Sequence, residues 1–142
     1  MRAIKETVVI MSASKSDLSA MENEARKHYL KSQLRVLADF GYIRFSHALG
    51  YYKGEVEHSF VIVIEREHSK VLKSMLMLAN DYEQESVLVR DDAGVYLHYM
   101  QYYPQPYRQP ERIGRDLYRV KFDGANRPDA FTYVNGQAWV AA

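Results

Sequence analysis

The sequence contains no cysteine. Disulfide bridges, thiolate metal sites and cysteine nucleophiles are therefore excluded, and the chain suits a reducing cytosol. It also lacks an excess of either charge, because 19 basic residues oppose 18 acidic ones, and this balance gives no reason to expect a nucleic-acid partner. The apolar run Thr7 to Met11 is too short for a signal sequence or a membrane span. We therefore expect a cytoplasmic protein that binds neither membranes nor nucleic acid.

The common local signatures of catalysis are missing as well. The sequence has no glycine-rich phosphate loop, no nucleophile elbow and no pair of histidines at metal-ligand spacing. Glu65 to His68 places two carboxylates beside an imidazole, but a charged junction between a strand and a helix is usually only solvated. We predict no metal site.

The length of 142 residues favours one domain, with a core over about 7–101 and a C-terminal extension over 102–142. Twelve tyrosines are present, concentrated between Tyr96 and Tyr107. Tyrosine is apolar on its ring and polar at its hydroxyl, so it suits ligand pockets and interfaces. This tyrosine-rich segment contains Tyr103-Pro-Gln-Pro-Tyr107, which interrupts regular structure and predicts a loop or an extended arm.

Apolar periodicity and turn residues predict two helices among the strands of the core. The first helix starts near Asp17 and ends at Gly41. Its expected core-facing residues are Leu18, Met21, Ala25, Tyr29, Leu34, Leu37 and Phe40. The second helix, capped by Ser69, would bury Leu72, Met75, Leu78 or Ala79, and Tyr82. The expected strands are Thr7 to Met11, Tyr42 to Tyr52, Val56 to Glu65 and Ser86 to Arg90, with Lys53-Gly54-Glu55 as a hairpin turn.

This order predicts an α+β fold, a ferredoxin-like βαββαβ sandwich with a C-terminal β extension. A further strand is expected at Val95 to Tyr99, and the extension would contain a strand at Leu117 to Phe122, followed by a hairpin turning at Asn135-Gly136. The first and third core strands are continuously apolar, which is typical of central strands buried on both faces. Since both helices cover the same face, we expect the extension or a second subunit to cover the other.

Three groups of polar residues could form a site, although each also has a purely structural interpretation. Tyr52 and Glu57 bracket the predicted turn and offer an aromatic face and a carboxylate, but a cross-strand surface pair explains them more simply. Ser12 to Ser16 could simply turn the chain and cap the first helix. Tyr82 to Glu85 could be a polar helix end with the tyrosine packed inward.

The order and spacing of several segments resemble the phage S-adenosylmethionine hydrolases, better described as lyases. The matching segments are Ser12-Ala13-x-x-Ser16-x-Leu18, Asn23-x-x-Arg26, Gly50-Tyr51-Tyr52, Glu57-His58, Ala79-Asn80-Asp81-Tyr82-Glu83-Gln84-Glu85 before Val87-Leu88-Val89, and the terminal Phe131-Thr132 with Trp139. The resemblance covers most of residues 7 to 99. Two departures from the family pattern are a shorter turn between Tyr52 and Glu57 and Tyr82 in place of a tryptophan.

The resemblance implies a homotrimer of ferredoxin-like subunits that binds S-adenosylmethionine between neighbouring chains without a metal or organic cofactor. It implies Glu57 and Tyr52 as catalytic residues. It implies substrate-binding residues at Ser12, Ala13, Ser16, Glu83 and Gln84.

The reaction implied by the resemblance gives 5′-methylthioadenosine and L-homoserine lactone, depletes the methyl donor of the host and so counters restriction. One alternative is hydrolysis to homoserine, which would need a general base to activate water. Another is a trimer that senses a nucleotide without turnover, because fold alone does not fix function. A nucleic-acid module that stacks bases on sheet aromatics is disfavoured by the balanced charge and the apolar strands.

Overall fold

The computed structural model describes residues 6–52, 54–65, 69–105, 108–122 and 127–142. Two helices and nine strands follow one another in these ranges. Their bounds are β1 Thr7–Ser12, α1 Ala20–Asp39, β2 Ile43–Tyr52, β3 Glu55–Ile64, α2 Ser69–Asp81, β4 Ser86–Asp91, β5 Gly94–Tyr99, β6 Glu111–Gly114, β7 Leu117–Val120, β8 Ala130–Val134 and β9 Gln137–Ala141. The predicted βαββαβ order of the core is confirmed.

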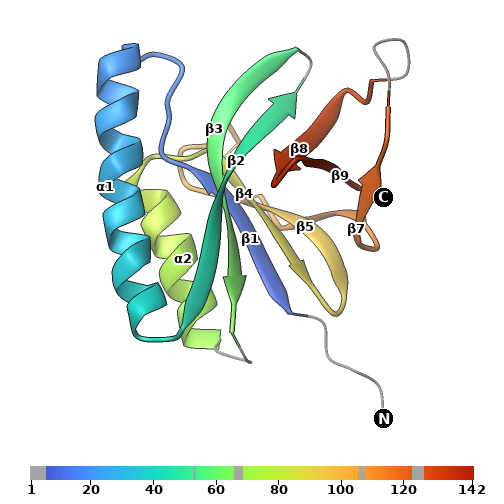
Figure 1. The fold of residues 1–142 in the computed structure, drawn as a ribbon, viewed down its shortest axis with the longest axis horizontal. Helices are drawn as coiled ribbons and strands as arrows, with labels where there is room; N and C mark the ends of the chain where they lie inside the picture. The colour runs from blue at the N-terminus through green and yellow to red at the C-terminus, as the bar shows by residue number, and fades with distance from the viewer. Residues whose placement is uncertain (1–5, 53, 66–68, 106–107, 123–126) are drawn as a thin grey trace.

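The strands form a single antiparallel sheet in the order β6-β5-β4-β1-β3-β2-β8-β9-β7. The core strands β1 and β3 lie side by side at its centre, as their continuous apolar sequences predicted. Both helices pack against one face of the sheet, and β7, β8 and β9 lie on the opposite side (Figure 1). The main hydrophobic core therefore lies between the two helices and the central strands.

Helix α1 begins at a capping box, in which the Ser19 hydroxyl accepts from the Glu22 amide and the Glu22 carboxylate accepts from the Ser19 amide. Gly41 follows the helix at a φ of +80°, a conformation that glycine adopts without a steric penalty. The helix buries Leu30 and Leu34 completely against the sheet. The helix ends where the sequence predicted, but it begins at Ala20 rather than near Asp17, and Ser19 caps it instead of a residue from Ser12 to Ser16.

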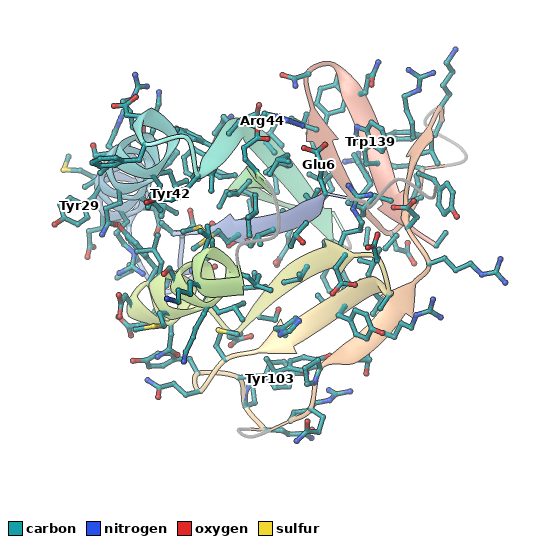
Figure 2. The ribbon with its side chains drawn as sticks, turned by 90° about the horizontal axis from the view of Figure 1, so that it is seen from below. Glu6, Tyr29, Tyr42, Arg44, Tyr103 and Trp139 are labelled. Carbon is teal, nitrogen blue, oxygen red and sulfur yellow. The ribbon has the colours of Figure 1, made fainter. Side chains whose placement is uncertain are left out.

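The predicted core-facing stripe of α1 is wrong in part. Leu34 is buried and Leu37 packs against the core, but Ala25 is exposed, and Met21, Tyr29 and Phe40 are 83%, 66% and 73% exposed. Figure 2 shows Tyr29 on the side of the helix that faces away from the sheet. The helix carries apolar residues on two faces, and periodicity alone does not say which face meets the sheet.

Helix α2 packs as its sequence predicted. Met75 and Ala79 are fully buried, Tyr82 just beyond the helix is buried, and Leu72 and Leu78 pack at the margin of the core. This helix is followed by β4, whose alternate residues Val87 and Val89 are buried. The second half of the core thus repeats the helix-then-strand unit of the first.

The sheet bends round on itself. Its two edge strands, β6 and β7, are consecutive in the chain, with only Arg115 and Asp116 between them. Laid flat, nine strands would hold their edges about 38 Å apart at about 4.8 Å per spacing. The three-residue step from Gly114 to Leu117 spans at most about 11 Å. The edges must therefore meet, and they do so where the amides of Arg115 and Asp116 donate to the main-chain oxygen of Ala142.

This curvature bears on the sheet face that the helices leave open. Val8 and Val95 share that face and are buried, and Arg90 between them pairs with Asp116 at 3.3 Å. Further along the same face, Ile10 and Val61 are only half-buried. The C-terminal strands thus cover one end of the face and leave the other end partly open.

The extension contains the expected hairpin at Asn135 and Gly136, whose φ values are +51° and +75°. Two successive positive φ values are typical of the tight turn that Asn-Gly favours. Strand β8 of this hairpin pairs with β2, so the hairpin adds strands to the side of the core sheet. Strand β6 was not predicted. Residues 106–107 of the tyrosine-rich segment and Lys53 of the β2–β3 turn lie outside the described ranges.

Candidate functional site

The predicted site residues come from three separate segments that meet at one end of β1. Ser12 ends β1, and the chain then forms the loop Ala13 to Leu18 before helix α1. The segment after α2, with Glu83 and Gln84, contacts this loop, and the β2–β3 hairpin brings Glu57 beside Ser12. Ser12 and the first loop residue, Ala13, are buried, and Ser16 further along the loop is exposed.

A pair of reciprocal hydrogen bonds connects the loop to α1. The amide of Lys15 donates to Asn23 Oδ1 at 2.9 Å, and Asn23 Nδ2 donates to the Lys15 carbonyl at 2.9 Å. The side chain of Asn23 thus satisfies both the main-chain amide and the main-chain carbonyl of Lys15, which in a loop would otherwise bond to water. This geometry gives a structural role to the asparagine of the Asn23-x-x-Arg26 motif.

Arg26 connects the loop to the segment after α2. Its Nε donates to the Ala13 carbonyl at 2.7 Å, and a terminal nitrogen donates to the Tyr82 carbonyl at 2.5 Å. The planar guanidinium can serve both carbonyls at once because its donors form a rigid fork. Arg26 and Asn23 belong to one motif of the family resemblance, which assigned no role to either residue.

Tyr82 is connected to helix α1 through its side chain as well as through its carbonyl. Its hydroxyl donates to Gln33 Oε1 at 2.6 Å, and burial raises its pKa to about 12. The phenol therefore remains protonated and keeps its hydrogen bond at any physiological pH. Tyr82 is packed inward, as the structural interpretation of the Tyr82 to Glu85 segment predicted.

Glu83 and Gln84 both reach the loop. The Glu83 carboxylate accepts from Lys15 Nζ at 2.9 Å, a hydrogen bond that raises the pKa of the lysine, and Glu83 itself has a φ of +57°. Gln84 is buried, and its Nε2 donates to the Ser14 carbonyl at 3.0 Å. The sequence gave no signal for Lys15, which the fold alone brings to Glu83.

Glu57 lies beside Ser12 on the sheet face away from the helices. The two residues are diagonal neighbours, because Ser12 pairs with Ser59 and Glu57 is two residues before Ser59 on β3. Partial desolvation raises the pKa of the Glu57 carboxyl, the nearby charge of Glu55 raises it further, and the Ser12 hydroxyl acts in the opposite direction. The same hydroxyl donates to the His58 carbonyl at 2.6 Å.

Tyr52 lies on the same sheet face as Glu57. The register pairs Tyr52 with Glu55 and Gly50 with Glu57, so Tyr52 and Glu57 are diagonal cross-strand neighbours. Such neighbours lie within reach of an aromatic side chain. Tyr52 is 61% exposed and lies beside the turn that joins β2 to β3.

Among the described residues, no group of three or more histidine, aspartate and glutamate side chains could hold a metal ion. Residues 66–68 of the charged cluster Glu65 to His68 are outside the described ranges. Neither described helix is long and apolar enough to cross a membrane.

The groups gathered here are of the kinds that recognise a cationic or hydroxyl-bearing part of a small molecule. It combines the solvent-exposed carboxylate of Glu57, whose pKa is raised, the exposed phenol of Tyr52 and a loop held in place by Asn23, Arg26 and Gln84. A comparison with protein-family models finds that the S-adenosylmethionine lyase family matches residues 9–142. No curated protein is significantly similar to the chain.

Proposed function

The chain belongs to the S-adenosylmethionine lyase family and is an enzyme of that class, and we propose that it converts S-adenosylmethionine to 5′-methylthioadenosine and L-homoserine lactone. The observation that carries this proposal is the family match over nearly the whole chain, joined to the position of Glu57 beside the Ser12 loop. In an anti-restriction role, the reaction would remove the methyl donor from the cytoplasm of a phage-infected host.

The proposed reaction needs no nucleophile from the protein. One oxygen of the substrate's own carboxylate attacks its γ-carbon, the bond from that carbon to the sulfonium sulfur breaks, and its electron pair stays on sulfur. The leaving group is a neutral thioether, and the new carbon–oxygen bond closes the lactone. Holding the methionine chain bent for this attack can supply about 7 to 11 kcal/mol of the barrier in favourable cases.

Exclusion of water would favour this reaction further. The substrate carboxylate and sulfonium neutralise each other as the transition state forms, so a less polar site strengthens their attraction. A protein carboxylate in close contact with the sulfonium would instead stabilise the ground state and slow the step. We therefore assign Glu57 to orienting the ribose or the methionine chain, with Tyr52 beside it.

The remaining predicted residues would shape the pocket. Ser12, Ala13 and Ser16 would present main-chain and hydroxyl groups to the substrate from the loop, and Glu83 and Gln84 would approach it from the segment after α2. The hydrogen bonds that join these two segments support a common pocket, because they hold both segments at one end of β1.

We further propose a single domain built on a ferredoxin-like core and assembled as a homotrimer with the sites between subunits. The strand order β4-β1-β3-β2 with both helices on one face supports this core. Half-buried apolar residues on the open sheet face, such as Ile10 and Val61, support an additional partner surface. Sedimentation would test the trimer, and a monomer at micromolar concentration would contradict it.

The product assay is the decisive experiment. Purified protein is incubated with S-adenosylmethionine, and the products are separated before the lactone opens spontaneously. Methylthioadenosine with homoserine lactone supports the lyase reaction, and methylthioadenosine with homoserine from the first time point indicates hydrolysis. Saturable binding without any product would favour a nucleotide-sensing trimer.

A further inference from the structure

The C-terminal hairpin places the only tryptophan of the sequence in line with Glu57. The register pairs Glu57 with Gly50, Gly50 with Thr132, and Thr132 with Trp139, across strands β3, β2, β8 and β9. Residues paired directly across antiparallel strands project from the same face of a sheet. Trp139 and Glu57 therefore share the face away from the helices, and the indole remains partly exposed. Figure 2 shows Trp139 on the C-terminal hairpin, across the molecule from α1.

The two residues between them are small. Gly50 has no side chain, and Thr132 is short, so the row has a shallow floor between a carboxylate and an indole. Three strand spacings of about 4.8 Å separate the two ends of the row by roughly 14 Å along the sheet. Neither of the two intervening residues has a side chain large enough to fill this distance.

Charge distinguishes the two ends of the row. Arg119 on β7 pairs with Trp139 and extends the row beyond it, whereas Glu55 and Glu57 place carboxylates at the other end. The positively charged methionine end would be repelled by the guanidinium and attracted by the carboxylates over a longer distance than the close contact that would slow the reaction. A neutral aromatic base has no such preference, and it gains from stacking on a flat ring.

We infer that Trp139 forms the adenine subsite of the enzyme, with the base stacked on the indole and the cationic methionine end directed toward Glu57. This inference rests on the proposed function for the identity of the ligand. It adds to the site a segment of the chain about 80 residues away from Glu57 in the sequence, a separation that follows from their numbers. The C-terminal hairpin would thereby be part of the substrate site as well as of the sheet.

The sole tryptophan makes a direct test possible. Its emission, excited where tyrosine does not absorb, is followed while intact protein is titrated with methylthioadenosine, which carries adenine but no sulfonium. Homoserine lactone, which lacks the base, is the matched ligand control. Saturable quenching by methylthioadenosine and none by homoserine lactone is the expected result.

Variants provide the second readout. Trp139→Leu should raise KM and weaken methylthioadenosine binding by roughly tenfold, with a smaller effect on kcat, because one base stack is lost. Trp139→Phe should retain part of the affinity. Tyr133→Leu is the matched control, since Tyr133 lies on the same hairpin but on the opposite face and is exposed, and it should leave KM unchanged.

The failure of this inference can be told apart from the failure of the proposed function. The adenine subsite alone is overturned if the enzyme turns over S-adenosylmethionine, methylthioadenosine does not change the Trp139 emission, and Trp139→Leu has an unchanged KM. Emission that responds to protein dilution but not to methylthioadenosine also overturns it, because the indole then lies in a subunit contact. Saturable quenching without turnover supports the subsite and contradicts the lyase reaction.

Discussion

Arg26 on helix α1 donates from Nε to the main-chain oxygen of Ala13 at 2.7 Å, and so links the helix to the loop that follows β1. A second donor of the same guanidinium serves the carbonyl of Tyr82. The two segments that carry the predicted substrate-binding residues are thus held by one side chain. This side chain need not touch the substrate to matter for activity.

Removal of this link should impair both stability and activity. Arg26→Ala should lower the free energy of unfolding by about 1.5 to 3 kcal/mol, the range for hydrogen bonds to charged groups. It should also raise KM, because the loop loses its fixed position. Arg26→Lys should restore little, since an ammonium lacks the planar fork. Arg35→Ala, at an exposed position on the same helix, is the control; an equal loss there would contradict a specific role for Arg26.

Glu57→Gln should lower turnover by roughly a hundredfold, the cost of a misplaced reacting group, and leave the oligomer intact. Tyr52→Phe should also lower turnover, because it removes a hydroxyl beside the β2–β3 turn, close to Glu57. Steady-state kinetics and sedimentation of both variants are the measurements. Near-normal turnover in both would remove these residues from the site.

The same Glu57→Gln variant should be slightly more stable than the parent at neutral pH. The folded-state pKa of Glu57 is raised above its ordinary value of 4.5, mainly by desolvation. Its contribution to stability is therefore fully present below about pH 4.5 and is lost as pH rises through the folded pKa. Thermal unfolding should show a higher Tm for the variant at neutral pH and no difference at pH values below 4.5. A gain in Tm that persists in acid would contradict this origin.

Glu55→Gln should shift the pH dependence of activity. The negative charge of Glu55 raises the pKa of Glu57, so its removal should lower that pKa. If Glu57 acts as a carboxylate, the acid limb of the kcat/KM profile should move to lower pH while the plateau is unchanged. An unshifted limb would show that another group controls it.

Gly136→Val should destabilise the C-terminal hairpin. Gly136 has a φ of +75° and a Cβ there would meet nothing within 4 Å, so the penalty comes from the backbone alone. A left-handed conformation costs an L-residue roughly 1 to 2 kcal/mol. Asn135→Gly keeps the turn accessible and is the control. Chemical denaturation should separate the two variants by about that amount.

Gly114→Ala should open the place where the two edges of the sheet meet. A Cβ at Gly114 would lie 2.6 Å from the amide nitrogen of Ala142, so the C-terminus would have to move. The expected loss of stability is about 1 to 3 kcal/mol. Gly50→Ala is the steric control, since its nearest contact would be an ordinary 3.5 Å to the Ser59 hydroxyl. Hydrogen exchange should localise the loss to β6, β7 and the C-terminus.

Local sequence signals predicted most of the elements correctly. The apolar run at Thr7, the spacing of Met75 and Ala79, and the Asn135-Gly136 turn each act over a few residues, and each element formed where its signal lay. Strand β6 escaped prediction because Glu111–Gly114 has no alternating apolar pattern and becomes a strand only by pairing with β5.

The sequence of this protein by itself determined the order of its elements, its central strands and the positions of its turns, because periodicity and backbone preference are properties of neighbouring residues. Only the tertiary structure decided which face of α1 is buried: Leu30 meets the sheet, whereas Met21 and Tyr29 face solvent. It alone also decided that Lys15 meets Glu83, and that Trp139 shares a row with Glu57. These relationships depend on pairing between distant strands, and no signal within a few residues of any of them specifies the partner.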